Sequence, residues 1–214
     1  MRRLRQAGLI VAALALAFAF GLAGAWYLGD GSIESREGSQ GLAGGLERPP
    51  GGAFLLSDQE GRAVDSRDLG HQYLLLYFGY TQCTDACPIA MQTISEALAQ
   101  LGAEERAGLA PLFVTIDPAL DTGPELARYL ENFHPSFRGL TGEAEAIASA
   151  AAAYQVGFER QAREDETGLR LIDHGTNIYL MAPDGGFLRK FDYRVASDRL
   201  AEVLAKVLSA QEQG

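Results

Sequence analysis

Two apolar runs with a helical segment between them limit the fold more than any other feature of the sequence. Tyr73–Phe78 and Leu112–Ile116 have the length and the continuous apolar character of strands that are buried on both faces. Pro88 suits the first turn of a helix that continues to about Leu101. A strand–helix–strand unit of this kind predicts a pair of parallel strands, and therefore an α/β fold.

Two hairpins and three helices are expected to complete this unit. Phe54–Leu56 and Arg62–Val64 predict a short N-terminal hairpin. Asn177–Met181 and Gly186–Phe191 surround a Pro-Asp-Gly turn and predict an antiparallel hairpin near the end of the chain. The expected helices are Thr122 to about Asn132, Glu143 to Tyr154, and Ser197 to about Leu208.

Local spacing predicts how two of these helices are built. In the helix after Pro88, apolar or small residues recur every four positions from Ile89 to Leu101, which predicts that this side packs on the sheet. Thr122 and Glu125 have the spacing of a capping box. Residues 53–210 are therefore expected to form one domain with a mixed central sheet, flanking helices and an extra N-terminal hairpin, which is a thioredoxin-like layout.

The N-terminal residues have a different character. Arg2, Arg3 and Arg5 precede 23 uncharged residues, Ala7–Gly29. At about 1.5 Å per residue such a helix spans roughly 34 Å, enough for a bilayer core of about 30 Å. We predict that residues 1–29 form a single transmembrane anchor in the inner membrane, with the C-terminal domain in the periplasm or an equivalent exported compartment. The alternative is a signal sequence that is cleaved at an Ala-x-Ala pattern, residues 23–25.

Between the anchor and the domain lies a predicted flexible linker, residues 30–52. It contains seven glycines and has no apolar periodicity. As a flexible coil it would span roughly 26 Å, which lets a tethered domain reach a partner in the same membrane.

The charge of the chain excludes one large class of partners. The formal net charge is −10, from 18 basic and 28 acidic residues. Nucleic-acid binding is not expected, because a phosphate backbone needs a cationic face. Two cysteines are too few for a multi-disulfide scaffold or a four-thiolate zinc site.

The two cysteines carry the main chemical prediction. Cys83 and Cys87 are separated by three residues and stand where a buried strand is followed by a helix. Free N–H groups and the helix dipole stabilise a thiolate at such a position, so both thiols are expected to ionise readily. Three interpretations follow: a redox dithiol, a site for a soft metal, and a buried structural pair.

His174 favours the metal among these interpretations. Two thiolates and one imidazole suit cuprous or cupric copper, and His174 stands just before the predicted C-terminal hairpin. Thioredoxins place a cis-proline in the corresponding loop, whereas this chain has no proline between Pro135 and Pro183. A Cys–His pair for acyl transfer would leave Cys87 without a role. His71 and His134 are expected to be exposed and inert.

Residues 159–170 are unusually rich in charge. They are expected to form a solvated loop or an exposed hairpin, and the functional alternative is a partner-recognition loop beside the site.

Four ordered motifs resemble those of the SCO/SenC family of copper-binding assembly proteins. The likeness extends over roughly residues 50–208, and the predicted anchor and linker match the family's layout. The motifs are residues 79–88 (GYTQCTDACP), residues 115–122 (TIDPALDT), residues 137–142 (FRGLTG), and residues 173–175 (DHG) followed by residues 179–185 (YLMAPDG).

The resemblance implies a thioredoxin fold and a copper site made by Cys83, Cys87 and His174. It favours a metallochaperone over an enzyme, one that supports assembly of the dinuclear copper site of cytochrome c oxidase subunit II. Other copper carriers or thiol reductants are further implied partners. The alternatives are a thiol–disulfide oxidoreductase that reduces that site's cysteines, and a copper or redox sensor. Gln82 and Thr84 depart from the His and Pro of many members.

The second motif also contains two acidic residues whose carboxylates are possible metal ligands. Asp117 and Asp121 are expected to fix their loop and the start of the next helix, not to bind metal.

Overall fold

The computed structural model describes residues 49–164 and 170–211, with the backbone alone for residues 159–164 and 170–174. The elements described belong to one compact unit, Arg48–Gly214. In chain order they are β1 (Leu55–Asp58), β2 (Ala63–Asp65), the 3-10 helix η1 (Ser66–Leu69), β3 (Tyr73–Gly79), α2 (Ala86–Gln100), α3 (Ala103–Ala107), β4 (Leu109–Thr115), α4 (Gly123–Leu130), β5 (Arg138–Thr141), α5 (Ala144–Ala153), β6 (Phe158–Glu164), β7 (Arg170–His174), β8 (Asn177–Met181), β9 (Phe187–Asp192) and α6 (Ser197–Gln211).

The central sheet is mixed, as the sequence predicts. Its strand order is β2-β1-β5-β4-β3-β8-β9. β3 pairs in parallel with β4, and β4 pairs in parallel with β5. β8 lies antiparallel to β3 and forms a hairpin with β9. The predicted strand–helix–strand unit and both predicted hairpins are therefore confirmed.

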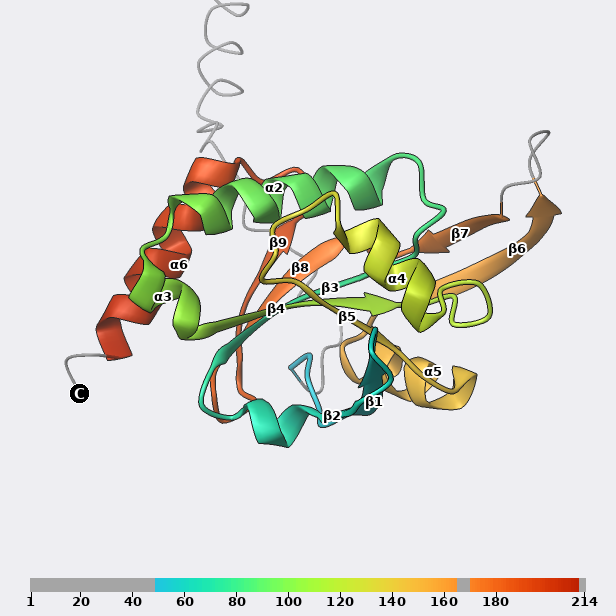
Figure 1. The fold of residues 1–214 in the computed structure, drawn as a ribbon, viewed down its shortest axis with the longest axis horizontal. Coiled ribbons are helices and arrows are strands. Elements are labelled where there is room, and N and C mark those ends of the chain that lie inside the picture. The colour runs from blue at the N-terminus through green and yellow to red at the C-terminus, as the bar shows by residue number, and fades with distance from the viewer. Residues whose placement is uncertain (1–48, 165–169, 212–214) are drawn as a thin grey trace, which may run out of the picture. The chain divides into compact units, whose positions relative to one another are not determined.

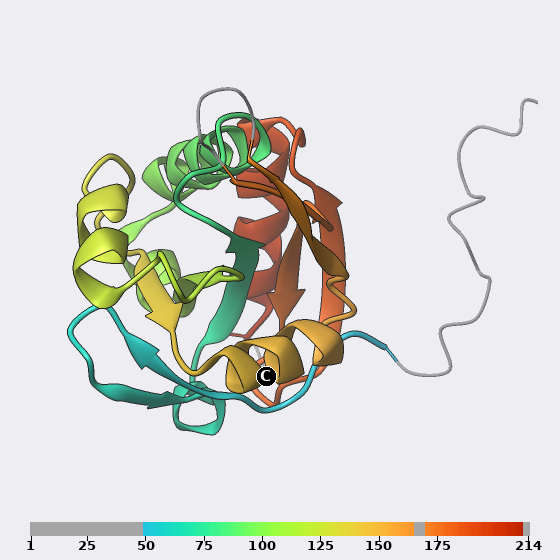
Figure 2. The ribbon, with the colours of Figure 1, turned by 90° about the vertical axis from the view of Figure 1, so that its right-hand side faces the viewer.

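Helices cover both faces of this sheet (Figure 1). α2 and α6 lie against each other over one face, while α5 lies on the opposite side (Figure 2). Successive side chains of β3 point to opposite faces of the sheet, and because both faces are covered, β3 is buried on both sides. Tyr77 approaches Cys87 at the start of α2, and Phe78 contacts the ring of Tyr154, which follows α5, with ring centroids 5.4 Å apart.

The buried side of α2 matches the predicted one only in part, since Ala97 and Leu101 of the predicted stripe are buried but Ile89 is not. The side chains that enter the core include Ala90, Ile94 and Ala97, which recur at three- and four-residue intervals. Ile89, which the four-residue spacing placed against the sheet, is 42% exposed. Sequence periodicity alone left two neighbouring stripes possible, and packing against the sheet and α6 selects between them.

Three local features were not predicted correctly. β5 was not predicted as a strand, yet it pairs with β4 and continues the sheet. α3 was not predicted at all. Thr122 stands at the N-cap of α4 but makes no side-chain capping hydrogen bond, so the predicted capping box is wrong.

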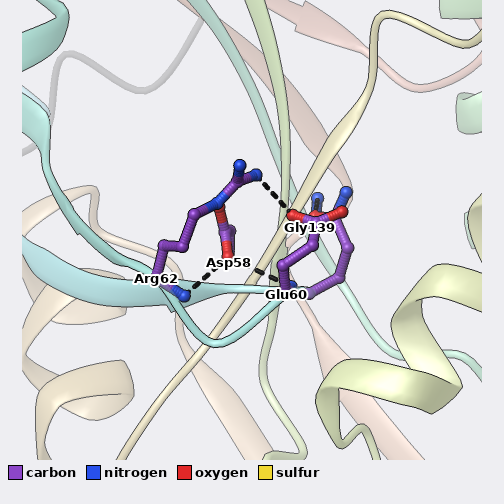
Figure 3. Close-up of polar contacts among 5 residues, drawn as sticks. Asp58, Glu60, Arg62 and Gly139 are labelled. Atoms are coloured by element: carbon purple, nitrogen blue, oxygen red, sulfur yellow. Dashed lines mark hydrogen bonds and ion pairs between the residues drawn. The ribbon is translucent and has the colours of Figure 1, made fainter.

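The turn of the N-terminal hairpin is held by a buried carboxylate (Figure 3). Asp58 is 2% exposed, and its Oδ1 accepts hydrogen bonds from the backbone N–H groups of Glu60 and Arg62. Its Oδ2 accepts from Nε of Arg62 at 2.8 Å. In the same turn the side-chain oxygen of Gln59 accepts from the backbone N–H of Gly139 at 2.8 Å, which joins the hairpin to β5.

The charged stretch at residues 159–170 forms a separate two-stranded sheet. β6 and β7 are antiparallel, and Phe158 pairs with His174 at one end of the ladder. In Figure 1 this hairpin extends beyond the end of the central sheet. Of the two expected forms, loop and hairpin, the backbone adopts the hairpin, and residues 165–169 lie outside the described residues.

The predicted anchor, residues 1–29, and the linker up to residue 48 lie outside the described residues. Within the part of the chain that the structure describes, none of the helices has both the length and the apolar character needed to cross a membrane. The boundaries of anchor, linker and domain stay predictions.

Candidate functional site

Both cysteines lie at the carboxyl end of β3, where the chain enters α2. Cys83 belongs to the connecting loop and Cys87 to the first turn of the helix. The backbone N–H of Cys87 donates a hydrogen bond to Sγ of Cys83 at 3.4 Å, and the two cysteines are not joined by a disulfide. The helix start thus directs one of its free N–H groups at the first sulfur, as the sequence argument required.

The two thiols differ in their access to solvent. Cys83 is half-buried, and its neighbours Gln82, Thr84 and Asp85 are exposed. Cys87 is fully buried. An incoming metal ion or partner thiol therefore meets Cys83 first, and Cys87 forms the inner end of the pair.

The structure corrects the prediction that both thiols ionise readily. The pKa of the Cys87 thiol is raised, first by its hydrogen bond with Cys83 and then by burial. The hydroxyl of Tyr77 donates to Sγ of Cys87 at 3.8 Å, which acts in the opposite direction but is outweighed. A helix N-terminus favours a thiolate only where solvation or charge does not oppose it, and burial opposes it here.

A second tyrosine lies near the inner end of the pair. The hydroxyl of Tyr129 in α4 is buried and has no hydrogen-bond partner among the described residues. Its pKa is raised by burial first, and then by the nearby Cys87 and Cys83. Its ring packs on Phe113, with centroids 5.3 Å apart. Cys87 therefore faces an aromatic interior with two hydroxyl groups.

Gly79 makes room for the buried thiol. A Cβ atom at this position would lie 2.8 Å from Sγ of Cys87 and 3.0 Å from both Phe113 Cε2 and Tyr77 Cε1. Real Cβ contacts below 3.0 Å are almost never seen. Packing of the site thus requires glycine at the end of β3, and the sequence motif alone did not indicate this requirement.

His174, the predicted third ligand, is placed only through its backbone. It is the last residue of β7 and lies opposite Phe158. Its side chain lies outside the described residues, so the three-ligand set stays a prediction. Among the side chains that are described, no group of three or more Cys, His, Asp and Glu is arranged to hold a metal ion.

The other two histidines differ from each other. His71 is exposed, as predicted. His134 is half-buried, and its Nδ1 accepts a hydrogen bond from the backbone N–H of Ser136 at 3.2 Å. Burial, followed by the nearby Arg106, lowers the pKa of His134. The prediction of an exposed side chain is therefore wrong for His134.

Comparison with known proteins decides the family. The SCO1/SenC family model matches residues 45–209. The chain belongs to the SCO1/SenC family. Protein SCO2 homolog, mitochondrial, from Bos taurus is 36% identical over 162 residues, which cover 74% of this chain and 60% of the relative. The chain thus spans less than two thirds of the length of this SCO relative.

Solved Sco structures have the same fold. ScoI of Bradyrhizobium japonicum, solved with copper bound, is 34% identical and superposes with a TM-score of 0.67, covering 73% of this chain and 98% of that chain. Yeast Sco1 with copper bound is 33% identical with a TM-score of 0.63, covering 72% and 88%. The mixed sheet with flanking helices is therefore the thioredoxin-like Sco fold that the sequence predicted.

Proposed function

We propose that this SCO1/SenC chain is a membrane-tethered copper chaperone. It binds one copper ion through Cys83, Cys87 and His174, and it supports assembly of the dinuclear copper site of cytochrome c oxidase subunit II. The observation that carries the proposal is the pair of reduced cysteines at the start of α2, with the N–H of Cys87 directed at Sγ of Cys83. The copper-bound structures of two Sco proteins about one third identical to this chain support the choice of metal.

The chemistry of the donors fits copper. Thiolates select soft ions, and an imidazole completes a three-coordinate set that both copper oxidation states accept. Because ligands bind in their deprotonated form, loading displaces the thiol protons. The raised pKa of Cys87 means that its proton leaves when the metal binds, not before. Oxidation of the pair to a disulfide abolishes the site, so the redox state controls loading.

Transfer of the metal begins at the accessible side. Cys83 is the more exposed thiol, and the side chains that flank it are exposed. A ligand of the acceptor protein replaces Cys83 first, and the buried Cys87 releases the ion last. The predicted anchor at residues 1–29 places this domain in the periplasm or an equivalent exported compartment, beside an acceptor in the same membrane.

A copper titration of the full chain in detergent micelles tests the ligand set. Under reducing conditions and against a competing chelator, we expect one Cu(I) per chain. Cys83→Ser, Cys87→Ser and His174→Ala each weaken binding by more than about a hundredfold, because loss even of an outer-shell partner of a ligand costs about 10–100-fold. His71→Ala, which changes an exposed histidine, is the matched control and leaves affinity unchanged. Tight binding that survives His174→Ala would overturn this assignment.

A dithiol oxidoreductase is the second candidate, because one thiol is accessible and the other is buried beside it. In this role Cys83 attacks a substrate disulfide and Cys87 resolves the mixed disulfide. We expect Cys87→Ser to trap a mixed disulfide with a subunit II copper domain that has been oxidised to its disulfide. If His174→Ala abolishes oxidase assembly in cells while disulfide exchange continues at the normal rate, the reductase role does not explain the function.

A further inference from the structure

A buried carboxylate joins the cysteine loop to the loop that follows the neighbouring strand. Asp121, after β4, is 1% exposed. Its Oδ2 accepts a hydrogen bond from the backbone N–H of Thr81 at 3.0 Å and from the hydroxyl of Thr115 at 2.6 Å. Its Oδ1 accepts from the hydroxyl of Thr81 at 2.5 Å. Thr81 stands two residues before Cys83, so the carboxylate holds the chain immediately before the first thiol.

The turn that carries Cys83 begins at this anchor point. The backbone N–H of Cys83 donates to the carbonyl of Tyr80 at 3.2 Å, so Thr81 lies inside the turn. The N–H of Ile116 donates to the carbonyl of Gly79 at 2.8 Å, which continues the β3–β4 pairing up to the start of the turn. Thr81 is thus fixed through both its backbone and its side chain, and Cys83 follows after one exposed residue.

The loop of Asp121 is itself held by hydrogen bonds. The N–H of Asp121 donates to the carbonyl of Asp117 at 2.9 Å, and the N–H of Asp117 donates to the hydroxyl of Thr115 at 2.9 Å. Thr115 lies at the end of β4, opposite Gly79 in β3. The carboxylate therefore links the cysteine turn to the end of β4 through hydrogen bonds.

Burial of this carboxylate has a cost that the three threonine contacts offset only in part, because the pKa of Asp121 stays raised. Desolvation raises the pKa of Asp121, and its hydrogen bonds with Thr115 and Thr81 act in the opposite direction. Asp58 is a buried carboxylate of similar exposure that bonds only within its own turn (Figure 3). Asp121 differs because it links two segments 40 residues apart in sequence, one of which carries the thiol.

We infer that Asp121 is a positioning residue for the dithiol: acting through Thr81, it fixes Cys83 at the distance and orientation from Cys87 that both cysteines need in order to react or bind together. Groups held in the reacting geometry have a high effective concentration, and release of one of them lowers it. The copper readout of this inference rests on the proposed function, whereas the thiol readout does not.

Equilibration of the full chain with glutathione measures this geometry without metal. The two cysteine thiols are oxidised to one disulfide, while glutathione disulfide is reduced to two glutathione thiols that take the two protons. The position of equilibrium gives the effective concentration of the thiol pair. We expect Asp121→Ala and Thr81→Val to lower this effective concentration at least about fivefold. Asp121→Ala removes both hydrogen bonds to Thr81, and Thr81→Val removes the one from its hydroxyl. Thr81→Ser keeps the hydroxyl and stays within twofold of the wild type.

Asp58→Ala is the control for a general loss of stability, since it removes a similarly buried carboxylate. The inference is overturned if Asp58→Ala lowers the effective concentration of the thiol pair equally, or if Thr81→Val leaves it at the wild-type value. If Asp121→Ala does not fold, Thr81→Val against Thr81→Ser decides the question. Cu(I) affinity should also fall in Asp121→Ala and Thr81→Val and stay near the wild-type value in Thr81→Ser. If the variants change the thiol equilibrium as expected but the wild-type chain binds no copper, the proposed function is refuted and the role of Asp121 stands.

Discussion

The fit of Gly79 against the buried cysteine makes Gly79→Ala a sharp test of how the site is built. The added methyl would lie 2.8 Å from Sγ of Cys87, whereas the optimum for such a contact is about 3.5–4.0 Å. The deficit is roughly 1 Å. Phe113 and Tyr77 approach the same point at 3.0 Å. All three neighbours are fully buried, so none can move into solvent.

The expected cost follows from this overlap. Extra methyl groups in a packed core destabilise by about 1–3 kcal/mol. Replacement of glycine by alanine without a clash stabilises by about 0.4–1 kcal/mol through the unfolded state, which offsets part of the cost. A net loss of about 1–2 kcal/mol leaves a domain of about 5–15 kcal/mol folded. Relief of the clash moves Sγ of Cys87, so copper affinity should fall with stability.

Urea denaturation and Cu(I) competition on the same protein measure both effects. With an m-value of about 1–3 kcal/mol/M, the unfolding midpoint should fall by about 1 M. Gly157→Ala is the matched control, because no atom that the structure describes lies within 4 Å of its Cβ position and its φ is not positive. A Gly79→Ala protein with wild-type stability and copper affinity would refute the packing argument. An equal loss in Gly157→Ala would show that the effect is not specific to the cysteine.

Two further predictions concern single polar groups. Tyr129→Phe removes a buried hydroxyl that has no partner among the described residues, so it should leave stability unchanged or raise it by about 1 kcal/mol. A loss above 1 kcal/mol in urea would reveal a hydrogen bond to that hydroxyl. A hydrogen bond from Arg67 lowers the pKa of Asp65 from 3.8 to about 2, which NMR titration should show, and Arg67→Gln should return it toward 3.8. Because the folded pKa is the lower one, this contribution to stability is present above pH 3.8 and is lost as the pH falls through about 2. An unchanged pKa in Arg67→Gln would contradict the assigned cause.

The elements that could be predicted are those with a strong local signal. β3 is a continuous apolar run, and the turn between β8 and β9 has a Pro-Asp-Gly sequence, so both were predicted within two residues. β5 has only four residues, and its middle pair, Gly139 and Leu140, carries no alternation. It becomes a strand because β4 offers it a parallel edge, and pairing of that kind is not encoded in a short window.

The candidate site likewise combines features that local sequence specifies with features that depend on the tertiary structure. The sequence by itself determined which side chains can take part, since the type and spacing of Cys83 and Cys87 at a strand–helix junction restrict the chemistry to thiols and soft metals. The tertiary structure decided how these thiols differ. Cys87 is enclosed by Tyr77 and Gly79 from the strand beneath it, and Asp121 reaches the cysteine turn from 40 residues away. Burial and long-range hydrogen bonds depend on which segments the fold brings together, and no local pattern in the sequence specifies them.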